Sequence, residues 1–380
     1  MMYYLPSKNL LGRNCIKALG PEIESYGFKK ALVVTDKYLN ENKIVKKVTD
    51  QLDKVNVEYV IYDEVKPNPT CSQVHQGIKI LKEAHCDFIL SIGGGSPQDC
   101  ASGISIIATN GGDIRDYEGI HQSKKAGFPT IAVNTTAGTS AELTINYVIT
   151  DENRKVKMVC VDKNSLALMS VNDPELMVDK PAHLTAATGM DALTHAIETI
   201  VTPGANQVTD ATALEAIKII FTHLPQAVKD GKDIEAREQM VYATFLAGMA
   251  FSNAGLGFVH AMAHQLGGVY DLPHGVCNAM LLPIVERENA KHAPEKFRLI
   301  AEKLGFNAKT ESDEACSTFV LEKIIELSEE VGIPKSLKEL GVENPDLELL
   351  AENALKDACA PGNPFMPTKE QTIEMFKVIL

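Results

Sequence analysis

The sequence predicts an N-terminal α/β domain with a parallel sheet, followed by an all-helical C-terminal domain. Up to about residue 180, short apolar runs rich in β-formers alternate with helical patterns, which is typical of strand–helix–strand units. After DPELMVDKP (173–181) the strand signal ends and only helical patterns follow. We therefore expect a dinucleotide-binding domain over residues 1–180 and a helical domain over residues 181–380.

Buried strands and amphipathic helices are expected to alternate in the first half. Val74, Ile78 and Leu81 recur at helical spacing and predict a helix over 72–85. The expected strands are ALVVT (31–35), VEYVIY (57–62), FILSI (88–92) and TIAVN (130–134). In the second half, the expected long helices cover 184–200, 209–225, 234–251 and 313–332.

Composition excludes several classes of protein. The 380 residues are 45% hydrophobic and 23% charged, as in folded domains rather than disordered chains. The net charge is −13 and no basic run exceeds two residues, so neither nucleic acid nor a membrane is an expected partner. The absence of a long apolar segment and of a secretory signal, with scattered cysteines, predicts a cytoplasmic protein with reduced thiols.

A glycine-rich turn follows the expected strand at 88–92. Gly94, Gly95 and Ser96 stand between this strand and an apolar helical pattern. Glycines here let backbone N–H groups approach an anion, and the helix N-terminus adds partial positive charge. The pattern favours a phosphate loop over a simple tight turn, although it is neither G-x-G-x-x-G nor a P-loop.

Two further segments are candidates for cofactor contacts. Thr135, Thr136 and Thr139 follow the strand at 130–134, where their hydroxyls could hold a ribose or pyrophosphate or could cap the next helix. Asp36 ends the strand at 31–35 and could accept hydrogen bonds from a ribose hydroxyl, which favours NAD over NADP. The alternative for Asp36 is also a helix cap.

Histidines in the second half form a pattern that suggests a metal site. Asp191 and His195 are four residues apart and share one helix face amid apolar residues. His260 and His264 are likewise four apart, and His274 follows. Imidazole and carboxylate ligands suit Zn²⁺ or Fe²⁺. Spacing alone leaves the ligand set open, with Asp271 as a further candidate and His274 with Cys277 as a rival closed zinc site.

The surroundings of these histidines carry no basic clamp. Residues 181–200 and 255–280 contain no Lys or Arg, so a phosphorylated or polycarboxylate substrate is not expected. A small neutral substrate fits better. A nucleotide domain combined with such a metal, with the cleft between the domains as the default ligand site, predicts hydride transfer on an alcohol or aldehyde.

The chain contains four recognisable motifs: GGGSPQD, NTTAGTSAE, ATGMDALTHAIE and GLGFVHAMAHQLGGVYDLPHGVCNAMLLP. Together they resemble the iron-containing (group III) alcohol dehydrogenases. The resemblance runs through the whole chain and is nearest to the branch of 1,3-propanediol dehydrogenase, lactaldehyde reductase and methanol dehydrogenase. It implies a Rossmann-like domain and a helical metal-binding domain, the fold shared with dehydroquinate synthase.

The resemblance also implies roles for individual residues. The metal ligands would be Asp191, His195, His260 and His274, while His264 lies near the nicotinamide and relays protons. Phe251 and Cys359 match positions near the substrate. The implied cofactors are NAD and Fe²⁺, with Zn²⁺ as a possible substitute, and the implied assembly is a homodimer or larger homo-oligomer. The implied cofactor contacts are Asp36, Gly94, Gly95, Ser96, Thr135, Thr136, Thr139, Asn146 and Lys157.

Two positions depart from the family pattern. Ser102 replaces a lysine that usually follows the glycine loop, and Phe365 replaces an arginine after Asn363-Pro364.

The leading function is an Fe²⁺- and NAD-dependent dehydrogenase of short-chain primary alcohols or diols. The rivals are a zinc-dependent glycerol dehydrogenase-type enzyme, a dehydroquinate synthase-like lyase, and a nucleotide-binding protein with a structural metal.

Overall fold

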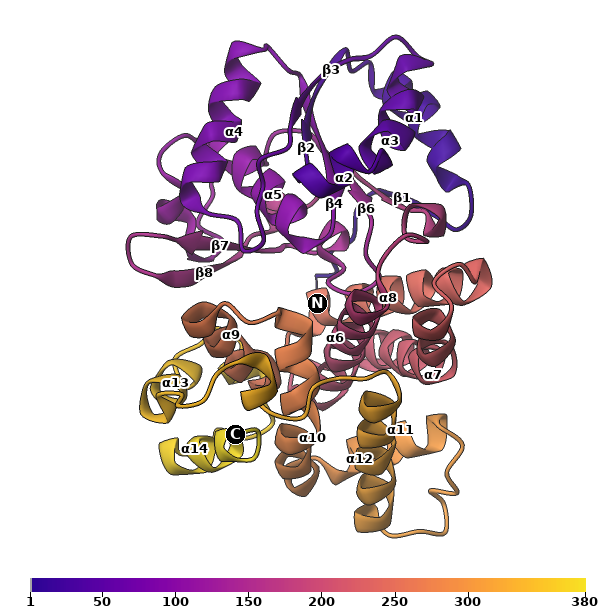
Figure 1. Cartoon of the computed structure of the whole chain (residues 1–380), viewed down its shortest axis with the longest axis vertical. Coiled ribbons are helices and arrows are strands. Elements are labelled where there is room, and N and C mark those ends of the chain that lie inside the picture. Colours follow the sequence, from indigo (N-terminus) through magenta and orange to yellow (C-terminus); the bar gives the residue numbers. More distant parts are fainter. Residues whose placement is uncertain (1) are drawn as a thin grey trace. The chain divides into compact units, whose positions relative to one another are not determined.

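The computed structural model describes residues 2–380 and divides the chain after Asp179 into two compact units (Figure 1). The strands of the first unit are β1 (Lys8–Leu11), β2 (Lys30–Val34), β3 (Glu58–Tyr62), β4 (Phe88–Gly93), β5 (Gly119–Ile120), β6 (Thr130–Asn134), β7 (Asn146–Asp151), β8 (Val156–Val161) and β9 (Met169–Asn172). Its α-helices are α1 (Leu19–Tyr26), α2 (Lys37–Glu41), α3 (Ile44–Asp53), α4 (Cys71–Glu83) and α5 (Gly95–Asn110). The expected α/β fold and its four strands are confirmed.

A six-stranded parallel sheet of order β1-β9-β6-β4-β2-β3 forms the centre of this unit. Helices α1 and α3 cover one face, and α4 and α5 cover the other (Figure 1). Residues of one strand alternate between the two cores: Phe88 and Leu90 pack on the α1/α3 side, whereas Ile89 packs on the α4/α5 side. Burial on both faces explains why these strands are continuous apolar runs in the sequence.

The strand order reverses between β2 and β4. The chain leaves β2 through α2 and α3 toward β3, but leaves β4 through α5 toward β6 on the other side of β2. The carboxyl ends of parallel strands meet at one edge, and ligands of open α/β sheets bind at such a reversal. Asp36, Gly94 and Thr135 follow β2, β4 and β6, so the three candidate cofactor segments lie along this edge.

A second sheet was not expected from the sequence. It has the order β5-β8-β7, and β7 and β8 form an antiparallel pair. These strands alternate between buried and partly exposed residues and include Asp151, which is 1% exposed. Their polar residues break the apolar run that would mark a strand buried on both faces.

The second unit contains helices joined by loops, with no strand among its described residues. Helix α6 is its central element, since nearly every residue from Thr185 to Val201 is buried, and it packs on α7, α8 and α10. An apolar surface on all sides is the pattern of a core helix. The α-helices are α6 (Ala182–Val201), α7 (Gln207–Lys229), α8 (Ile234–Ala254), α9 (Phe258–Tyr270), α10 (His274–His292), α11 (Pro294–Lys303), α12 (Asp313–Glu330), α13 (Leu347–Ala354) and α14 (Lys369–Lys377).

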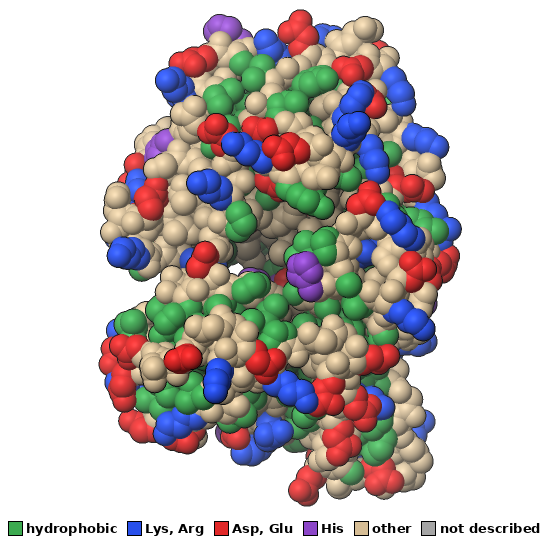
Figure 2. Space-filling view, in the orientation of Figure 1, with side chains coloured by type: hydrophobic (Ala, Val, Ile, Leu, Met, Phe, Trp, Pro, Cys, Tyr) green, Lys and Arg blue, Asp and Glu red, His purple; other side chains and the backbone are tan. Residues whose placement is uncertain are grey.

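The distribution of surface charge and the state of the cysteines agree with what the composition predicts. Acidic and basic side chains are interspersed on the face shown in Figure 2. The eight cysteines, all within residues 2–380, are free thiols, and six of them are buried. No single helix in the described part of the chain is long and apolar enough to span a membrane; only α8 with α9 meets that test as a pair, bent by 102°.

Candidate functional site

Helix α6 carries the first two candidate ligands into the interior of the helical unit. Asp191 is 1% exposed and His195 is 4% exposed. They face the same way because residues four apart lie one above the other on a helix. Burial raises the pKa of Asp191, but His195, His274 and His260 outweigh it, so the net pKa lies below the usual value. The carboxylate is therefore ionised although it is buried.

The third candidate ligand, His260, enters from the first turn of α9. Its ring stacks on His195 with the centroids 4.7 Å apart, and one ligand atom from each of Asp191, His195 and His260 lies within 4.8 Å of the others. Burial, followed by the charge of His195, lowers the pKa of His260 well below its ordinary value. The ring is therefore neutral at physiological pH, which is the form that binds metals.

His274 is the first residue of α10 and lies beside the same carboxylate. Its Nε2 is 3.5 Å from Asp191 Oδ1. The close approach depends on Gly275, because a Cβ there would lie 2.3 Å from the carbonyl oxygen of Ala187 on α6. The side chain of His274 is 30% exposed, so this ligand leaves the cluster open on one side.

The lone pairs of three candidate ligands converge on one point. The amide nitrogen of Asn278 lies 2.7 Å from Asp191 Oδ1 and 3.1 Å from Nε2 of both His260 and His274. Converging acceptors in a buried site need a donor or a cation between them. An ionised Asp191 and a neutral His260 are in the protonation states that a divalent metal requires, so the donor set fits the expected ion.

His264 lies next to the cluster and makes its own polar contact. Its Nδ1 is 3.0 Å from Asp357 Oδ2, and its ring stacks on His274 at 5.5 Å. Burial raises the pKa of Asp357, but the charge and hydrogen bond of His264 outweigh it and leave the pKa lowered. An ionised Asp357 accepts Nδ1–H of His264, which leaves Nε2 as the proton acceptor.

The two candidate substrate residues lie on different sides of these histidines. Phe251 on α8 is 5% exposed and stacks on the ring of His195 with centroids 4.2 Å apart. Cys359 lies with His264 and Asp357 in a second cluster of potential ligand atoms. Burial raises the pKa of the Cys359 thiol well above its ordinary value. It is therefore an uncharged side chain beside His264.

The structure does not bring the alternative metal ligands Asp271 and Cys277 into a cluster of ligand atoms among the described residues. Asp271 is exposed at the C-terminal end of α9, and Cys277 is buried within α10. Neither belongs to any group of three potential ligand atoms between residues 2 and 380.

Sequence reasoning missed Glu198, which is fully buried on α6. Its carboxylate lies 2.5 Å from Nδ1 of His260. The signal was present, because Glu198 stands three residues after His195 and seven after Asp191, on the same helix face. A glutamate in so apolar a helix requires a partner.

In the first unit, the glycine loop and the threonine segment pack against each other. A Cβ at Gly94 would lie 2.9 Å from Thr136, and one at Gly95 would lie 3.2 Å from Thr139. Backbone N–H of Thr135 donates to the carbonyl oxygen of Gly93 at 3.1 Å. Ser96 lies in the first turn of α5, whose N-terminus provides free N–H groups, so the donors suit a pyrophosphate.

The remaining candidate cofactor residues lie at the end of β2 and in the second sheet. Asp36 is the N-cap of α2, and its carboxylate accepts from the N–H of Leu39 at 2.9 Å, so the capping alternative is real. Burial raises its pKa. Lys157 on β8 pairs with Thr150 on β7, and paired residues share a face of the sheet. Asn146 is four residues before Thr150 on the same strand, so Asn146 and Lys157 lie on the same face. Lys157 Nζ donates to Asn68 at 2.8 Å.

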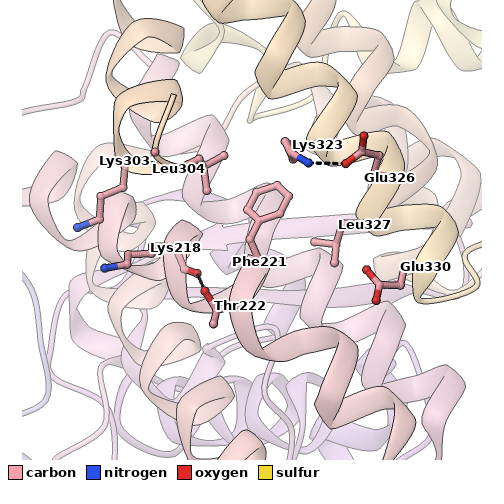
Figure 3. Close-up of a pocket in the computed structure, with 10 residues that line it drawn as sticks. Lys218, Phe221, Thr222, Lys303, Leu304, Lys323, Glu326, Leu327 and Glu330 are labelled. Carbon is pink, nitrogen blue, oxygen red and sulfur yellow. Dashed lines mark hydrogen bonds and ion pairs between the residues drawn. The ribbon is translucent and has the colours of Figure 1, made fainter. Parts of the chain in front are cut away.

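A pocket of 530 Å³ between α7, α11 and α12 contains none of these candidates (Figure 3). Two of its lysines are paired with carboxylates, Lys303 with Glu215 and Lys323 with Glu326, while Lys218 and Glu330 also line it. None of its lining residues is a histidine, so it does not resemble the metal cluster in chemistry.

The comparisons with known proteins agree with this arrangement. Models of "Iron-containing alcohol dehydrogenase" and of "Fe-containing alcohol dehydrogenase family, C-terminal" match residues 6–174 and 185–380. The chain is 48% identical over 377 residues to 1,3-propanediol dehydrogenase of Citrobacter freundii, covering 99% of this chain and 97% of the relative. It is 43% identical over 375 residues to NAD-dependent methanol dehydrogenase of Bacillus methanolicus, covering 99% and 98%. A crystal structure of 1,3-propanediol oxidoreductase matches with a TM-score of 0.97 and 47% identity, covering 100% of this chain and 99% of that one.

Proposed function

This chain belongs to the iron-containing alcohol dehydrogenase family, and from that premise we propose that it interconverts short-chain primary alcohols or diols with their aldehydes. It is an alcohol dehydrogenase that uses NAD and a divalent metal, and the family and branch expected from the motifs are confirmed. The buried group of Asp191, His195 and His260, with His274 beside it, carries the proposal.

For the metal, we propose Fe²⁺ held by Asp191, His195, His260 and His274. One carboxylate with three imidazoles is a donor set of intermediate softness, which supports Fe²⁺ and also accepts Zn²⁺. For the cofactor, we propose that the Gly94–Ser96 loop and Thr135, Thr136 and Thr139 bind the pyrophosphate and ribose, that Asp36 selects NAD, and that Asn146 and Lys157 add contacts.

In the proposed reaction, residues of this chain transfer a proton, hold the His195 ring in place and line the substrate pocket. A divalent metal held by the four candidate ligands would supply a Lewis acid for the alcohol oxygen, and NAD⁺ held in the first unit would supply the hydride acceptor that converts the alcohol to its aldehyde. His264 Nε2 receives the proton that leaves the hydroxyl, while Asp357 holds the opposite side of the ring. Phe251 braces the ring of His195, and the uncharged thiol of Cys359 contributes to an apolar substrate pocket.

The test is alcohol oxidation followed by NADH absorbance under anaerobic conditions. Metal-stripped enzyme is reloaded with Fe²⁺ or Zn²⁺ and supplied with ethanol, 1-butanol, 1,2-propanediol or 1,3-propanediol. We expect activity with Fe²⁺ and loss of both metal and activity in His260→Ala. His183→Ala, an exposed histidine of the same unit, is the control. No turnover with either metal would instead favour the lyase or a structural metal.

Assembly and compartment complete the proposal. We propose a homodimer or larger homo-oligomer, which light scattering of the purified protein tests. The eight free thiols support a reducing compartment such as the cytoplasm.

A further inference from the structure

The N-terminus of α9 is capped by side chains from distant segments. The first N–H groups of a helix have no partner within it, and the N-cap residue here is Gly257, which has no side chain. Glu198 Oε1 accepts from the N–H of Val259 at 2.7 Å and from that of His260 at 3.4 Å. Asn363 Oδ1 accepts from the N–H of Phe258 at 3.2 Å. Glu198 on α6 therefore fixes the helix end that carries His260.

The second oxygen of the same carboxylate holds the histidine ring. Glu198 Oε2 lies 2.5 Å from Nδ1 of His260, and both side chains are at most 1% exposed. The ring is thus held through the backbone and through the side chain by one residue.

The opposite edge of the ring faces the candidate ligands. Nε2 of His260 lies 3.1 Å from the amide nitrogen of Asn278 and 4.0 Å from Asp191 Oδ1. A neutral imidazole has one N–H and one lone pair. Burial raises the pKa of Glu198 to about 7 although backbone N–H groups oppose it, so the carboxylate is ionised above that pH. The ionised carboxylate at Nδ1 takes the N–H, so the lone pair remains on Nε2, where the amide of Asn278 donates to it.

We propose that Glu198 is a positioning residue that sets both the orientation and the tautomer of His260, so that Nε2 is available to a divalent cation; this inference rests on the proposed metal centre. Asp191, His195 and Glu198 stand at i, i+4 and i+7 of α6. One face of one helix thus carries two ligands and the partner of a third. Hydrogen-bond partners of metal-bound histidines orient the ring and raise its basicity.

The isosteric substitution Glu198→Gln gives a specific expectation. The backbone N–H groups of Val259 and His260 can only donate, so they hold the amide oxygen of the new side chain. Its NH₂ group then faces Nδ1, which must become the acceptor. His260 changes to the Nε2–H tautomer, which has no lone pair for the cation.

Two measurements test this on the full-length apoprotein. Histidine ¹⁵N NMR, at a pH above the pKa of Glu198 where the His260 ring is neutral, reports the tautomer of His260. Competition with a chelator reports the affinity for Zn²⁺, a diamagnetic probe. We expect Nδ1–H in the wild type, Nε2–H in Glu198→Gln, and an affinity about 10–100-fold weaker in the variant. Glu142→Gln is the matched control, the same substitution at a buried glutamate of the first unit that belongs to no group of candidate ligands in the described chain, and we expect wild-type affinity.

Several outcomes would overturn the inference. Wild-type affinity and tautomer in Glu198→Gln would do so, as would equal weakening in Glu142→Gln, which indicates a general loss of packing alone. The Nε2–H tautomer in the wild type would do so without any variant, should Glu198→Gln fail to fold. If the wild type binds no Zn²⁺, or Asp191→Asn binds it equally well, the metal centre itself is refuted and the inference falls with it.

Discussion

The buried carboxyl of Glu142 is expected to make the free energy of unfolding depend on pH. It follows the threonine segment of the cofactor edge and is 2% exposed. Burial raises the pKa of its carboxyl from 4.5 to about 7, and the amides of Asn172 and Asn134 oppose this only in part. In the unfolded chain the same group ionises near its ordinary pKa. We therefore expect the stability of the wild type to depend on pH through this residue.

The sign follows from proton linkage. Between pH 4.5 and about 7 the folded protein keeps a proton that the unfolded chain has lost, so the free energy of unfolding falls as the pH rises. At about 1.4 kcal/mol per tenfold change in proton affinity, the fall totals about 3 kcal/mol and is complete above the folded pKa. Glu142→Gln cannot ionise and lacks this loss. The variant should therefore gain stability relative to the wild type by about 3 kcal/mol between acidic and mildly alkaline pH.

Urea unfolding followed by circular dichroism checks this at about pH 5 and about pH 8. The quantity to compare is the change with pH in the stability difference between variant and wild type, because other titrating groups cancel in it. Glu24→Gln, an exposed glutamate of α1, is the control and should show no such change. An equal stability difference at both pH values would refute the reasoning, because the buried carboxyl would then not hold its proton.

Three further substitutions test the proposed roles. His264→Ala should lower kcat by about 10²–10⁴-fold with the metal retained, measured by turnover and metal content; loss of the metal would show that His264 is a ligand. Asp36→Gly should raise kcat/KM for NADP relative to NAD, since glycine replaces a capping residue at small cost and removes the charge; Asp36→Asn keeps the cap as control, and an unchanged ratio contradicts the ribose assignment. Gly275→Ala should weaken metal binding, measured by chelator competition, because its Cβ would lie 2.3 Å from the oxygen of Ala187 and displace His274; unaltered affinity would mean that α10 shifts freely.

The α/β half shows which structure could be predicted from local pattern. The run FILSI predicts a strand because both faces of β4 are buried, so its residues are apolar apart from Ser91. The β7–β8 pair was missed because its faces differ and because Asp151 is buried through pairing with Arg154 and Arg115. Arg154 lies in the turn that follows Asp151, but Arg115 comes from a distant segment that local pattern does not connect to it.

The departures from the family pattern are partly explained by contacts. Phe365 stacks on His292 of α10 with the centroids 4.1 Å apart, so an aromatic contact stands where an arginine is usual. Nothing in the structure explains Ser102.

Local pattern in the chain predicts the α/β and helical halves and the pairs Asp191–His195 and His260–His264, because helical periodicity is a local property, and the four motifs identify the family. Which side chains meet across the molecule depends on the packing of distant segments. Contacts of α6 with α10 and with the first turn of α9 bring His274 and His260 to Asp191 and join Glu198 to His260, while the segment after α13 brings Asp357 to His264. These contacts join residues that lie about 60 to 90 positions apart in the chain. They depend on how whole helices pack, and no spacing within one segment encodes that packing.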